Sequence, residues 1–376
     1  MPAVTDERAA QVREIELRRV RLPLVRPFRT ALGVDRERDA LVVRIATDSG
    51  NGWGECVAQR EPTYTSEWVG GAQAVIREFL APMLLAEPVT ASAVAARLAG
   101  VKGHPMAKAA LEMAVLDAEL RATGTALGKR LGAVRDFVEC GVAVGIADSI
   151  DALVDEVGGY LAAGYRRVKL KIRPGWDVEP VAAIRARFGD IALQVDANGA
   201  YTLADAHALG ALDELALLLV EQPLAEDDLV GHAELARLIA TPICLDESIT
   251  SALVARRAIE MGACSVICIK PGRVGGYLEA VRVHDVCREH DVAAWCGGML
   301  ETGLGRAANL ALAALPGFTL PGDLSASDRY FARDLTAPFV ADDGRLAVPS
   351  TPGIGIAPDP DALRDLTTSI EVITKP

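Results

Sequence analysis

The sequence predicts an α/β protein: a (β/α)8 TIM-like barrel with an N-terminal α+β capping domain that the C-terminal segment completes. Three observations predict this fold. Residues 14–57 alternate polar and apolar positions as strands do, and residues 66–133 carry apolar residues at helical spacing. From residue 136, short apolar runs alternate with amphipathic helical segments. Eight strands and at least seven helices with tight loops favour a barrel over a doubly wound open sheet, whose ligand residues would gather at one switch point.

These changes of pattern divide the 376 residues into three parts. The expected boundaries are 1–134 for the capping domain, 135–325 for the barrel and 326–376 for the segment that returns to the capping domain. A loop at 25–39 is expected between the first two strands of the capping domain. The expected barrel strands are 138–145, 166–171, 191–196, 216–221, 242–246, 265–270, 292–296 and about 317–322. The expected barrel helices are 149–163, 177–188, 203–213, 229–239, 250–261, 275–289 and 303–314.

Composition and charge limit the classes of partner. The chain is 51% hydrophobic and 24% charged with a net charge of −12, so we expect a globular protein without a nucleic-acid partner. The longest apolar runs, such as 215–220, are too short to span a membrane, and the first residues lack a secretory signal pattern. Seven scattered cysteines without a CxxC motif indicate free thiols and a cytoplasmic location. Cys264 and Cys268 are interpreted as small buried hydrophobes rather than metal ligands.

Charged residues close five of the expected strands at a nearly constant interval. Lys171, Asp196, Glu221 and Asp246 follow one another at intervals of 25 residues, and Lys270 comes 24 residues after Asp246. Each interval has the length of one β/α unit. Because the C-terminal ends of barrel strands converge on one mouth, these five side chains are expected to lie together at an active site.

The three acids predict a metal site. Carboxylates at neighbouring strand ends would repel one another and raise one another's pKa. A divalent cation removes this repulsion, and all-oxygen ligands suit Mg²⁺, with Mn²⁺ as the second option. Asp196, Glu221 and Asp246 are therefore the predicted ligands, and Asn198 and Glu247 are expected to support them or replace one. The alternative is that these acids cap helices or pair with arginines.

The lysines are expected to face the barrel interior. Lys169 and Lys171 alternate with Val168 and Leu170, so both point to one side of their strand. Lys171 and Lys270 end the second and sixth strands, which lie on opposite sides of an eight-stranded ring. A nearby metal and mutual repulsion would lower the pKa of both lysines, so each is a predicted general base. The alternative places Lys169 and Lys171 on the surface of an edge strand.

A metal between two opposed bases suits proton abstraction α to a carboxylate, through an enediolate that the metal and an ammonium group stabilise. A base on each face permits racemisation. A base on one face, with departure of a leaving group, permits syn elimination of water. Two other classes stay open: a Schiff-base aldolase, in which a barrel lysine is the nucleophile, and a non-catalytic binding barrel.

At these residues the chain resembles the enolase superfamily, in its muconate-lactonising subgroup. The resemblance rests on the Lys-x-Lys motif at 169–171, the acids after the next three strands and Lys270, and it extends over nearly the whole chain. The stretch WCGGMLE at 295–301 lacks the histidine that the mandelate-racemase subgroup would carry. The resemblance implies that Lys171 and Lys270 are the paired acid/base residues and that Lys169 supports Lys171 and the enediolate. It also implies that the three acids bind Mg²⁺.

Within this subgroup, the stretches VKLKIRPGWDVEPV, TPICLDESI, KPGRVGG and WCGGMLETGLGRA resemble the o-succinylbenzoate synthase / N-succinylamino acid racemase group. That resemblance implies a small carboxylate substrate, and either racemisation of N-succinylamino acids or dehydration to o-succinylbenzoate for menaquinone biosynthesis. It further implies a homo-oligomer, an octamer or a dimer. Arg273 is typical of the members with racemase activity. Cys268 and Gly199 depart from the usual pattern, which has Asn and a bulkier residue there.

Dipeptide epimerases and muconate-type cycloisomerases are the alternatives within the subgroup. Dipeptide epimerases usually carry an Asp-x-Asp motif near the eighth strand that holds the substrate ammonium. The stretch LPGDLSAS offers only Asp323 at this point, which favours an N-acylated substrate. Glu301 is assigned to a loop at the mouth, without a role in proton transfer.

Substrate contacts are expected from the mouth of the barrel and from two loops of the capping domain. Arg273 and the loop after the seventh strand, with Gly298 and Met299, are assigned to the mouth. The capping loops are assigned four residues: Arg26, Arg29, Trp53 and Tyr64. The alternative for the two capping arginines is a solvated loop charge.

Overall fold

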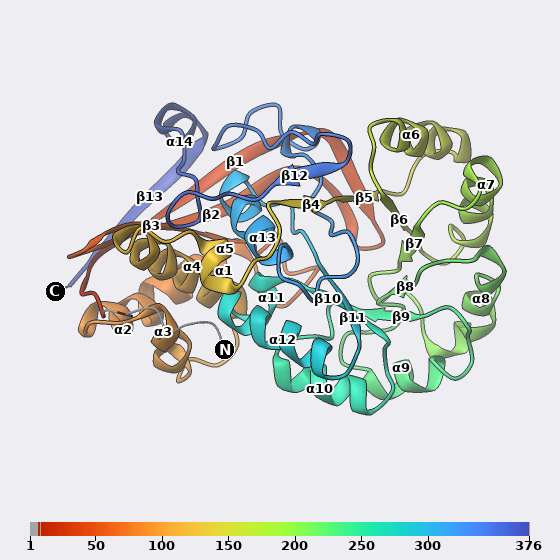
Figure 1. The fold of residues 1–376 in the computed structure, drawn as a ribbon, viewed down its shortest axis with the longest axis horizontal. Helices are drawn as coiled ribbons and strands as arrows, with labels where there is room; N and C mark the ends of the chain where they lie inside the picture. Colours follow the sequence, from red (N-terminus) through yellow and green to blue (C-terminus); the bar gives the residue numbers. More distant parts are fainter. Residues whose placement is uncertain (1–6, 8, 376) are drawn as a thin grey trace.

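The computed structural model describes residue 7 and residues 9–375, and it contains two main sheets (Figure 1). A four-stranded antiparallel sheet has the order β13-β1-β2-β3, and a seven-stranded parallel sheet runs in chain order from β5 to β11. The antiparallel strands are β1 (Val12–Thr30), β2 (Gly33–Thr47), β3 (Gly50–Cys56) and β13 (Thr367–Thr374). The parallel strands are β5 (Gly141–Val144), β6 (Arg167–Lys171), β7 (Leu193–Asp196), β8 (Val220–Glu221), β9 (Ile243–Leu245), β10 (Val266–Ile269) and β11 (Ala293–Cys296).

The antiparallel sheet of the capping domain is completed by the end of the chain. β13 pairs with β1 along almost its whole length, with Leu17 opposite Glu371. The fold-class prediction that the C-terminal segment joins the capping domain is therefore confirmed. A small second pairing, between β4 (Phe137–Glu139) and β12 (Arg345–Ala347), ties the same segment to the start of the barrel.

Helices cover one face of the capping sheet, and the close packing of β3 against these helices depends on two glycines. A Cβ atom at Gly52 would lie 2.0 Å from the carbonyl oxygen of Ala114, and one at Gly54 would lie 2.1 Å from that of Ala110. Only glycine lets β3 approach α4 this closely. The helices of this domain are α1 (Val69–Val75), a π-helical turn η1 (Ile76–Leu80), α2 (Ala81–Ala86), α3 (Ala91–Leu98), α4 (Pro105–Ala122) and α5 (Leu127–Leu131).

One helical stretch of this domain, Val69–Ala86, is long and apolar enough by composition alone to cross a membrane. Its apolar residues Ile76, Leu80 and Leu84 are fully buried in the core of the capping domain. The stretch is therefore a core element of a folded domain, as the apolar face of an amphipathic helix requires.

The segment 25–39, which was expected to be a loop, is instead the long hairpin between β1 and β2. The strands continue to Thr30 and resume at Gly33, and the pairing in this part of the hairpin is irregular between Pro23 and Phe28. Proline has no N–H to donate to the ladder, which accounts for an irregularity at this point. The hairpin extends the capping sheet towards the mouth of the barrel.

The expected eighth strand, 317–322, does not form a regular strand. This segment still closes the barrel, because Gly141 N donates to the Gly322 oxygen (2.7 Å) and Asp323 N donates to the Cys296 oxygen (3.2 Å). It therefore bridges β11 and β5 through isolated contacts. Pro321 cannot donate a ladder hydrogen bond, which explains why no continuous strand forms here.

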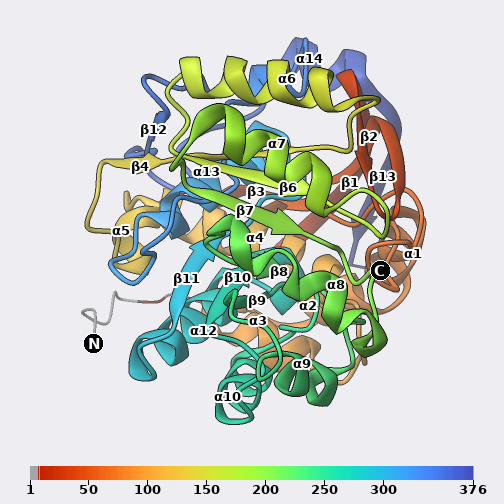
Figure 2. The ribbon, with the colours of Figure 1, turned by 90° about the vertical axis from the view of Figure 1, so that its right-hand side faces the viewer.

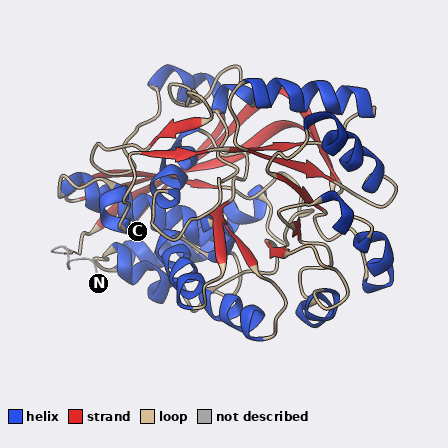
Figure 3. Ribbon diagram, turned by 45° about the vertical axis from the view of Figure 1, so that its right-hand side comes forward, coloured by secondary structure: helices blue, strands red, loops and turns tan. Residues whose placement is uncertain are grey.

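Helices pack around the outside of the parallel sheet, as Figures 2 and 3 show. Several are shorter than expected, and the helix expected at 203–213 is reduced to a 3-10 turn followed by a short α8. The outer helices are α6 (Ile150–Ala162), α7 (Val178–Phe188), α8 (Ala206–Gly210), α9 (Leu229–Leu235), α10 (Ala252–Glu260), α12 (Tyr277–Glu289) and α13 (Gly303–Ala313). The short helices α11 (Pro271–Val274) and α14 (Pro360–Leu366) and the 3-10 turns η2 (Leu203–Asp205), η3 (Asp213–Leu215) and η4 (Ser327–Arg329) complete the set.

The barrel interior has an apolar layer below a charged layer. Leu219, Cys244, Cys268 and Trp295 are fully buried and pack together. Leu219, Cys244 and Cys268 each lie two residues before a charged residue of the mouth, so each shares the inner face with that residue. The apolar layer keeps water away from the base of the charged groups, which increases the strength of their mutual interactions.

Candidate active site

The charged residues of the barrel mouth line a cavity of about 460 Å³ beneath the hairpin of the capping domain. Lys169, Lys171 and Lys270 reach this cavity from the ends of β6 and β10. The capping domain covers it with residues of the β1–β2 hairpin and of the loop after β3: Phe28, Thr30, Leu32, Arg36, Arg60 and Tyr64 among them. The site is thus formed between the two parts of the fold.

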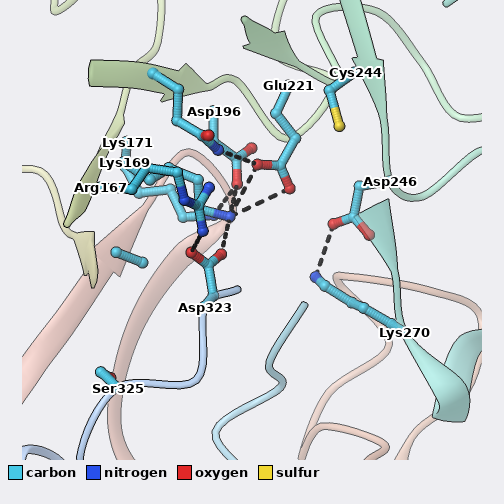
Figure 4. A network of polar contacts seen from close by, with 12 residues as sticks. Arg167, Lys169, Lys171, Asp196, Glu221, Cys244, Asp246, Lys270, Asp323 and Ser325 are labelled. Carbon is cyan, nitrogen blue, oxygen red and sulfur yellow. Dashed lines mark hydrogen bonds and ion pairs between the residues drawn. The ribbon is translucent and has the colours of Figure 1, made fainter. Parts of the chain in front are cut away.

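Lys169 is the centre of the densest ion-pair network (Figure 4). Its ammonium nitrogen lies 2.9 Å from Glu221 Oε2, 3.1 Å from Asp196 Oδ2 and 2.5 Å from Asp323 Oδ2. Asp323 Oδ1 in turn accepts a hydrogen bond from Arg167 Nη2 at 2.6 Å. All five side chains are buried, so this network is nearly free of solvent screening.

Lys171 forms a second, smaller cluster at the end of β6. Its ammonium donates to Asp196 Oδ2 and to Asn198 Oδ1, both at 2.7 Å. Asn198 connects this cluster to Glu247, because its amide donates to Glu247 Oε1 at 2.9 Å. Asn198 and Glu247 therefore lie where the sequence placed them, next to the acids that they follow.

Lys270 lies on the other side of the site, where Figure 4 shows it with Asp246, apart from the cluster around Lys169. Its ammonium donates to Asp246 Oδ2 at 2.7 Å and to the Tyr64 hydroxyl at 3.1 Å. Arg273 contacts the other oxygen of Asp246 and donates to the Tyr64 hydroxyl at 3.2 Å. Arg273 is held rigidly from behind, because its guanidinium also donates to the backbone oxygens of Ile249 and Cys268.

The buried charges shift one another's pKa values. Burial alone would lower the pKa of Lys169 and of Lys270. Asp323, Glu221 and Asp196 raise the pKa of Lys169 well above the usual lysine value, and Tyr64, Cys268 and Glu247 do the same for Lys270. Burial would likewise raise the pKa of Asp196, yet Lys171 and Lys169 hold it well below its usual range. The lowering expected for Lys171 and Lys270 depends on a nearby metal ion and stays a prediction.

Two of the acids, Glu221 and Glu247, have pKa values above the usual range. Burial and the Asp196 charge raise the pKa of Glu221, and the same two causes raise the pKa of Glu247 to about 7. Glu247 Oε2 and the Gln194 side-chain oxygen are buried and have no hydrogen-bond partner within the described residues. The site therefore holds buried oxygen atoms without donors, and a bound cation would satisfy them.

The donor set fits a divalent ion. One ligand atom each of Glu221, Asp246 and Cys268 lies within 4.8 Å of the other two. Asp196 is outside this closest group, and its carboxylate contacts both Lys169 and Lys171. Cys268 was expected to be a buried hydrophobe; it is buried, and its sulfur also lies beside two of the acids.

The residues predicted to contact substrate divide into two groups. Tyr64, Gly298 and Met299 line the cavity. Met299 is fixed by Glu301, which accepts from the Met299 N–H at 2.6 Å and lies in the mouth loop as expected. Arg273 lies behind Asp246 and does not line the cavity.

The other three predicted substrate residues lie outside the cavity lining: Arg26, Arg29 and Trp53. Arg26 is exposed, and Arg29 pairs with Asp148 on the surface at 2.6 Å. Two other arginines of the capping domain, Arg36 and Arg60, line the cavity instead. The pairing of β1 with β2 decides this, since it determines which hairpin side chains face the barrel.

Sequence reasoning missed Arg167 and Trp295. Arg167 is fully buried, and its guanidinium carbon lies 4.4 Å from the centre of the Trp295 ring. The signal was present in RVKLK, because Arg167 alternates with Lys169 and Lys171 and must share their inner face. Asp323 was noticed only as an incomplete motif, and its pairing with these two cations could not be read from the sequence.

Comparison with known proteins covers nearly the whole chain. Residues 12–132 match the mandelate racemase / muconate lactonizing enzyme N-terminal domain, and residues 152–362 match the enolase C-terminal domain-like family. An N-succinylamino acid racemase from Amycolatopsis sp is 61% identical over 357 residues, which are 94% of this chain and 97% of that protein. An o-succinylbenzoate synthase from Geobacillus kaustophilus is 46% identical over 92% of this chain and 93% of its own length.

Comparison with solved structures agrees with the sequence comparison. The crystal structure of an enolase superfamily member from Listeria innocua Clip11262 matches with a TM-score of 0.93 and 38% sequence identity. The match covers 97% of this chain and 99% of the other.

Proposed function

Because this chain belongs to the mandelate racemase / muconate lactonizing enzyme group of the enolase superfamily, we propose that it racemises N-succinylamino acids and also dehydrates the precursor of o-succinylbenzoate. Both reactions begin with removal of a proton α to a carboxylate. One observation carries the assignment to this site: Lys171 and Lys270 enter the same cavity from different strands, with the acids between them.

In racemisation, the two lysines act on opposite faces of the α-carbon. The neutral amine of one lysine takes the α-proton, and the ammonium of the other delivers a proton to the opposite face. The net result is inversion, and the two lysines have exchanged protonation states. Lys169, which stays charged among Asp196, Glu221 and Asp323, stabilises the negative charge that develops on the substrate carboxylate.

In the dehydration, Lys171 serves first as base and then as acid. It removes the α-proton and returns a proton to the departing hydroxide, so that water leaves from the same face. The Lys270 ammonium stabilises the enediolate instead of transferring a proton. The same two side chains therefore support both reactions with different divisions of work.

Superfamily members use a divalent metal ion, and we assign Mg²⁺, with Mn²⁺ as a substitute, to Asp196, Glu221 and Asp246. When bound, the ion supplies positive charge that stabilises the enediolate. Asn198 and Glu247 support these ligands through the Lys171–Asn198–Glu247 contacts. The ion would engage the acids that Lys171 and Lys270 contact here, which would leave both side chains free to contact substrate.

The enzyme acts on a small carboxylate, and Asp323 supports an N-acylated one. Both oxygens of Asp323 are already engaged, one by Arg167 and one by Lys169. This carboxylate is therefore not free to bind the ammonium group that an unacylated substrate would bring. Arg36, which lines the cavity from the hairpin, is the proposed partner of the succinyl carboxylate. We also propose a cytoplasmic protein, since all seven cysteines are free. The resemblance to the racemase and synthase group supports a homo-oligomer, a dimer or an octamer.

Proton exchange at the α-carbon tests the proposal. The full chain with Mg²⁺ is incubated with an N-succinyl-L-amino acid in D₂O, and deuterium incorporation is followed by NMR for each enantiomer. The wild type exchanges and racemises both. Lys171→Ala and Lys270→Ala each retain exchange of one enantiomer only and lose racemisation by about 10³-fold, whereas Lys129→Ala, on an exposed position of α5, matches the wild type.

Absence of exchange with every N-acylamino acid, with Mg²⁺ bound, would contradict the proposal. Exchange that survives EDTA, together with trapping of the substrate on Lys270 by borohydride, would support a Schiff-base enzyme instead. Dehydration activity is measured separately, by formation of the aromatic product.

A further inference from the structure

A thiol lies beside two of the acids in the barrel interior. Cys268 precedes Lys270 by two residues on β10, so strand alternation points both side chains inward. Its sulfur, an oxygen of Glu221 and an oxygen of Asp246 all lie within 4.8 Å of one another. The three donors come from β8, from the end of β9 and from β10, and all three side chains are buried.

The chain packs closely against this sulfur. Gly297 faces it from just after β11, and a Cβ atom at that position would lie 2.5 Å from Cys268 Sγ. The thiols of Cys244 and Cys296 donate to backbone carbonyls, at 3.9 and 3.8 Å, whereas the thiol of Cys268 has no hydrogen bond within the described residues. The Gln194 side chain, which donates to Glu221 Oε2, leaves its own buried oxygen without a partner nearby.

We propose that Cys268 is a ligand for borderline and soft divalent ions, namely Co²⁺, Zn²⁺ and Cd²⁺, which it binds together with Glu221 and Asp246. The inference rests on the proposed metal site and adds a donor to it. A metal–thiolate bond of about 2.3 Å and a metal–carboxylate bond of about 2.1 Å place neighbouring ligand atoms about 3.5 Å apart in a tetrahedral ion. Small side-chain rotations reach that spacing from the one described here.

The chemistry of the donors separates two classes of ion. Mg²⁺ takes oxygen ligands and leaves the thiol uncoordinated, whereas thiolate favours softer ions. When a soft ion binds, the sulfur–metal bond forms, the thiol proton leaves to solvent, and Glu221 and Asp246 release the lysines that hold them now. The chain therefore carries two overlapping ligand sets, one all-oxygen and one with sulfur.

The absorption spectrum of the cobalt complex tests this. Metal-free full-length protein is titrated with Co²⁺ alone, and equilibrium dialysis counts the bound ions. We expect a near-ultraviolet sulfur-to-cobalt charge-transfer band that saturates at one Co²⁺ per chain. Cys268→Ser still binds one Co²⁺ but loses the band. Cys244→Ser, which changes the neighbouring thiol of the same apolar layer, keeps it.

Affinity gives a second readout. Cys268→Ser lowers the affinity for Cd²⁺ by about tenfold or more, while the affinity for Mg²⁺ stays within about twofold of wild type. If the serine variant does not fold, the cadmium-113 NMR shift of the wild-type complex decides, because sulfur ligation moves the resonance far from that of an all-oxygen site.

Three outcomes overturn the inference. They are a wild-type protein with one bound Co²⁺ and no charge-transfer band, a band that persists in Cys268→Ser, and an all-oxygen cadmium shift. These outcomes would not contradict the proposed Mg²⁺ site of Asp196, Glu221 and Asp246. A protein that binds neither Co²⁺ nor Mg²⁺ in dialysis would overturn the proposed metal site as well, so the two failures are distinguishable.

Discussion

Lys169 and Asp323 form a close ion pair, with 2.5 Å between the ammonium nitrogen and Oδ2, and Arg167 anchors Asp323 from below. Lys169 shares its other contacts with two predicted metal ligands, Asp196 and Glu221. Once those acids bind an ion, Asp323 is the partner that remains. The pair therefore determines where the Lys169 ammonium stands when substrate is bound.

Asp323→Asn is expected to lower kcat by about 100-fold, because loss of this pair lets Lys169 move by a distance that matters for orientation. KM should change much less, since the α-carboxylate keeps its other partners. Steady-state kinetics of racemisation check the split between the two constants. Asp328→Asn, an exposed aspartate of the same segment, is the control. Equal losses in both variants, or a change confined to KM, would contradict the role given to Asp323.

Arg36→Gln is expected to raise KM for N-succinyl substrates by about tenfold and to leave N-acetyl substrates unaffected, because only the succinyl group carries a second carboxylate. Arg26→Gln is the matched control, since Arg26 lies on the same hairpin outside the cavity lining. The ratio of kcat/KM for the two substrates is the measurement. An unchanged ratio in Arg36→Gln would assign the succinyl group to another part of the cavity.

Mg²⁺ is expected to raise the melting temperature of the wild type, because the ion relieves repulsion between buried acids and binds only the folded chain. Burial and Asp196 raise the pKa of Glu221, so this side chain reports the repulsion directly. Glu221→Gln should lose most of the Mg²⁺ effect in a thermal scan, and Glu226→Gln, outside the ligand set, should keep it. EDTA should abolish the shift in the wild type. A Mg²⁺ shift that survives in Glu221→Gln would remove Glu221 from the ligands.

Glu112 should make folding sensitive to pH. Burial raises the pKa of this side chain from 4.5 to about 7, and it joins α4 to the start of α12 by accepting from Leu278 N at 3.0 Å. When the pKa of a carboxyl is higher in the folded state, its contribution to folding stability is complete below pH 4.5. That contribution is lost as the pH rises through 7. The loss is up to about 3 kcal/mol of unfolding free energy.

Urea unfolding at pH 5 and pH 8 checks this contribution. Glu112→Gln keeps an acceptor for Leu278 N and cannot ionise, so its unfolding free energy should fall less than that of the wild type over the same interval. Glu78→Gln, on an exposed part of the π-helical turn, should behave as the wild type does. Identical pH dependence in Glu112→Gln and wild type would show that Glu112 is not the sensitive group.

The sequence predicted the barrel well where side-chain alternation determines direction. VKLKI placed Lys169 and Lys171 on one inner face, and the equal spacing of the acids placed them at neighbouring strand ends. The same rule would have found Arg167 and Cys268 if it had been applied two residues upstream of each lysine. The prediction of an eighth strand was wrong because Pro321 interrupts the hydrogen-bond ladder, and a pattern of apolar residues does not reveal such an interruption.

The substrate side of the cavity was harder to predict. Arg26 and Arg36 lie ten residues apart in the same hairpin, and composition gives no reason to prefer either. The irregular pairing between Pro23 and Phe28 decides which one faces the mouth. The partners of Asp323 depend on contacts across about 150 residues of chain, between β6 and the segment after β11, and a local pattern cannot contain that information.

The pairing of β1 with β13 has a consequence for synthesis of the protein. Glu14 lies opposite Thr374, so β1 is completed by a strand that is made after all the barrel strands. Until then the outer edge of β1 remains open to pairing with other chains. The barrel strands are all available earlier. The capping sheet is therefore finished after the barrel, and a chain truncated within β13 would be prone to aggregation while keeping every charged residue of the mouth.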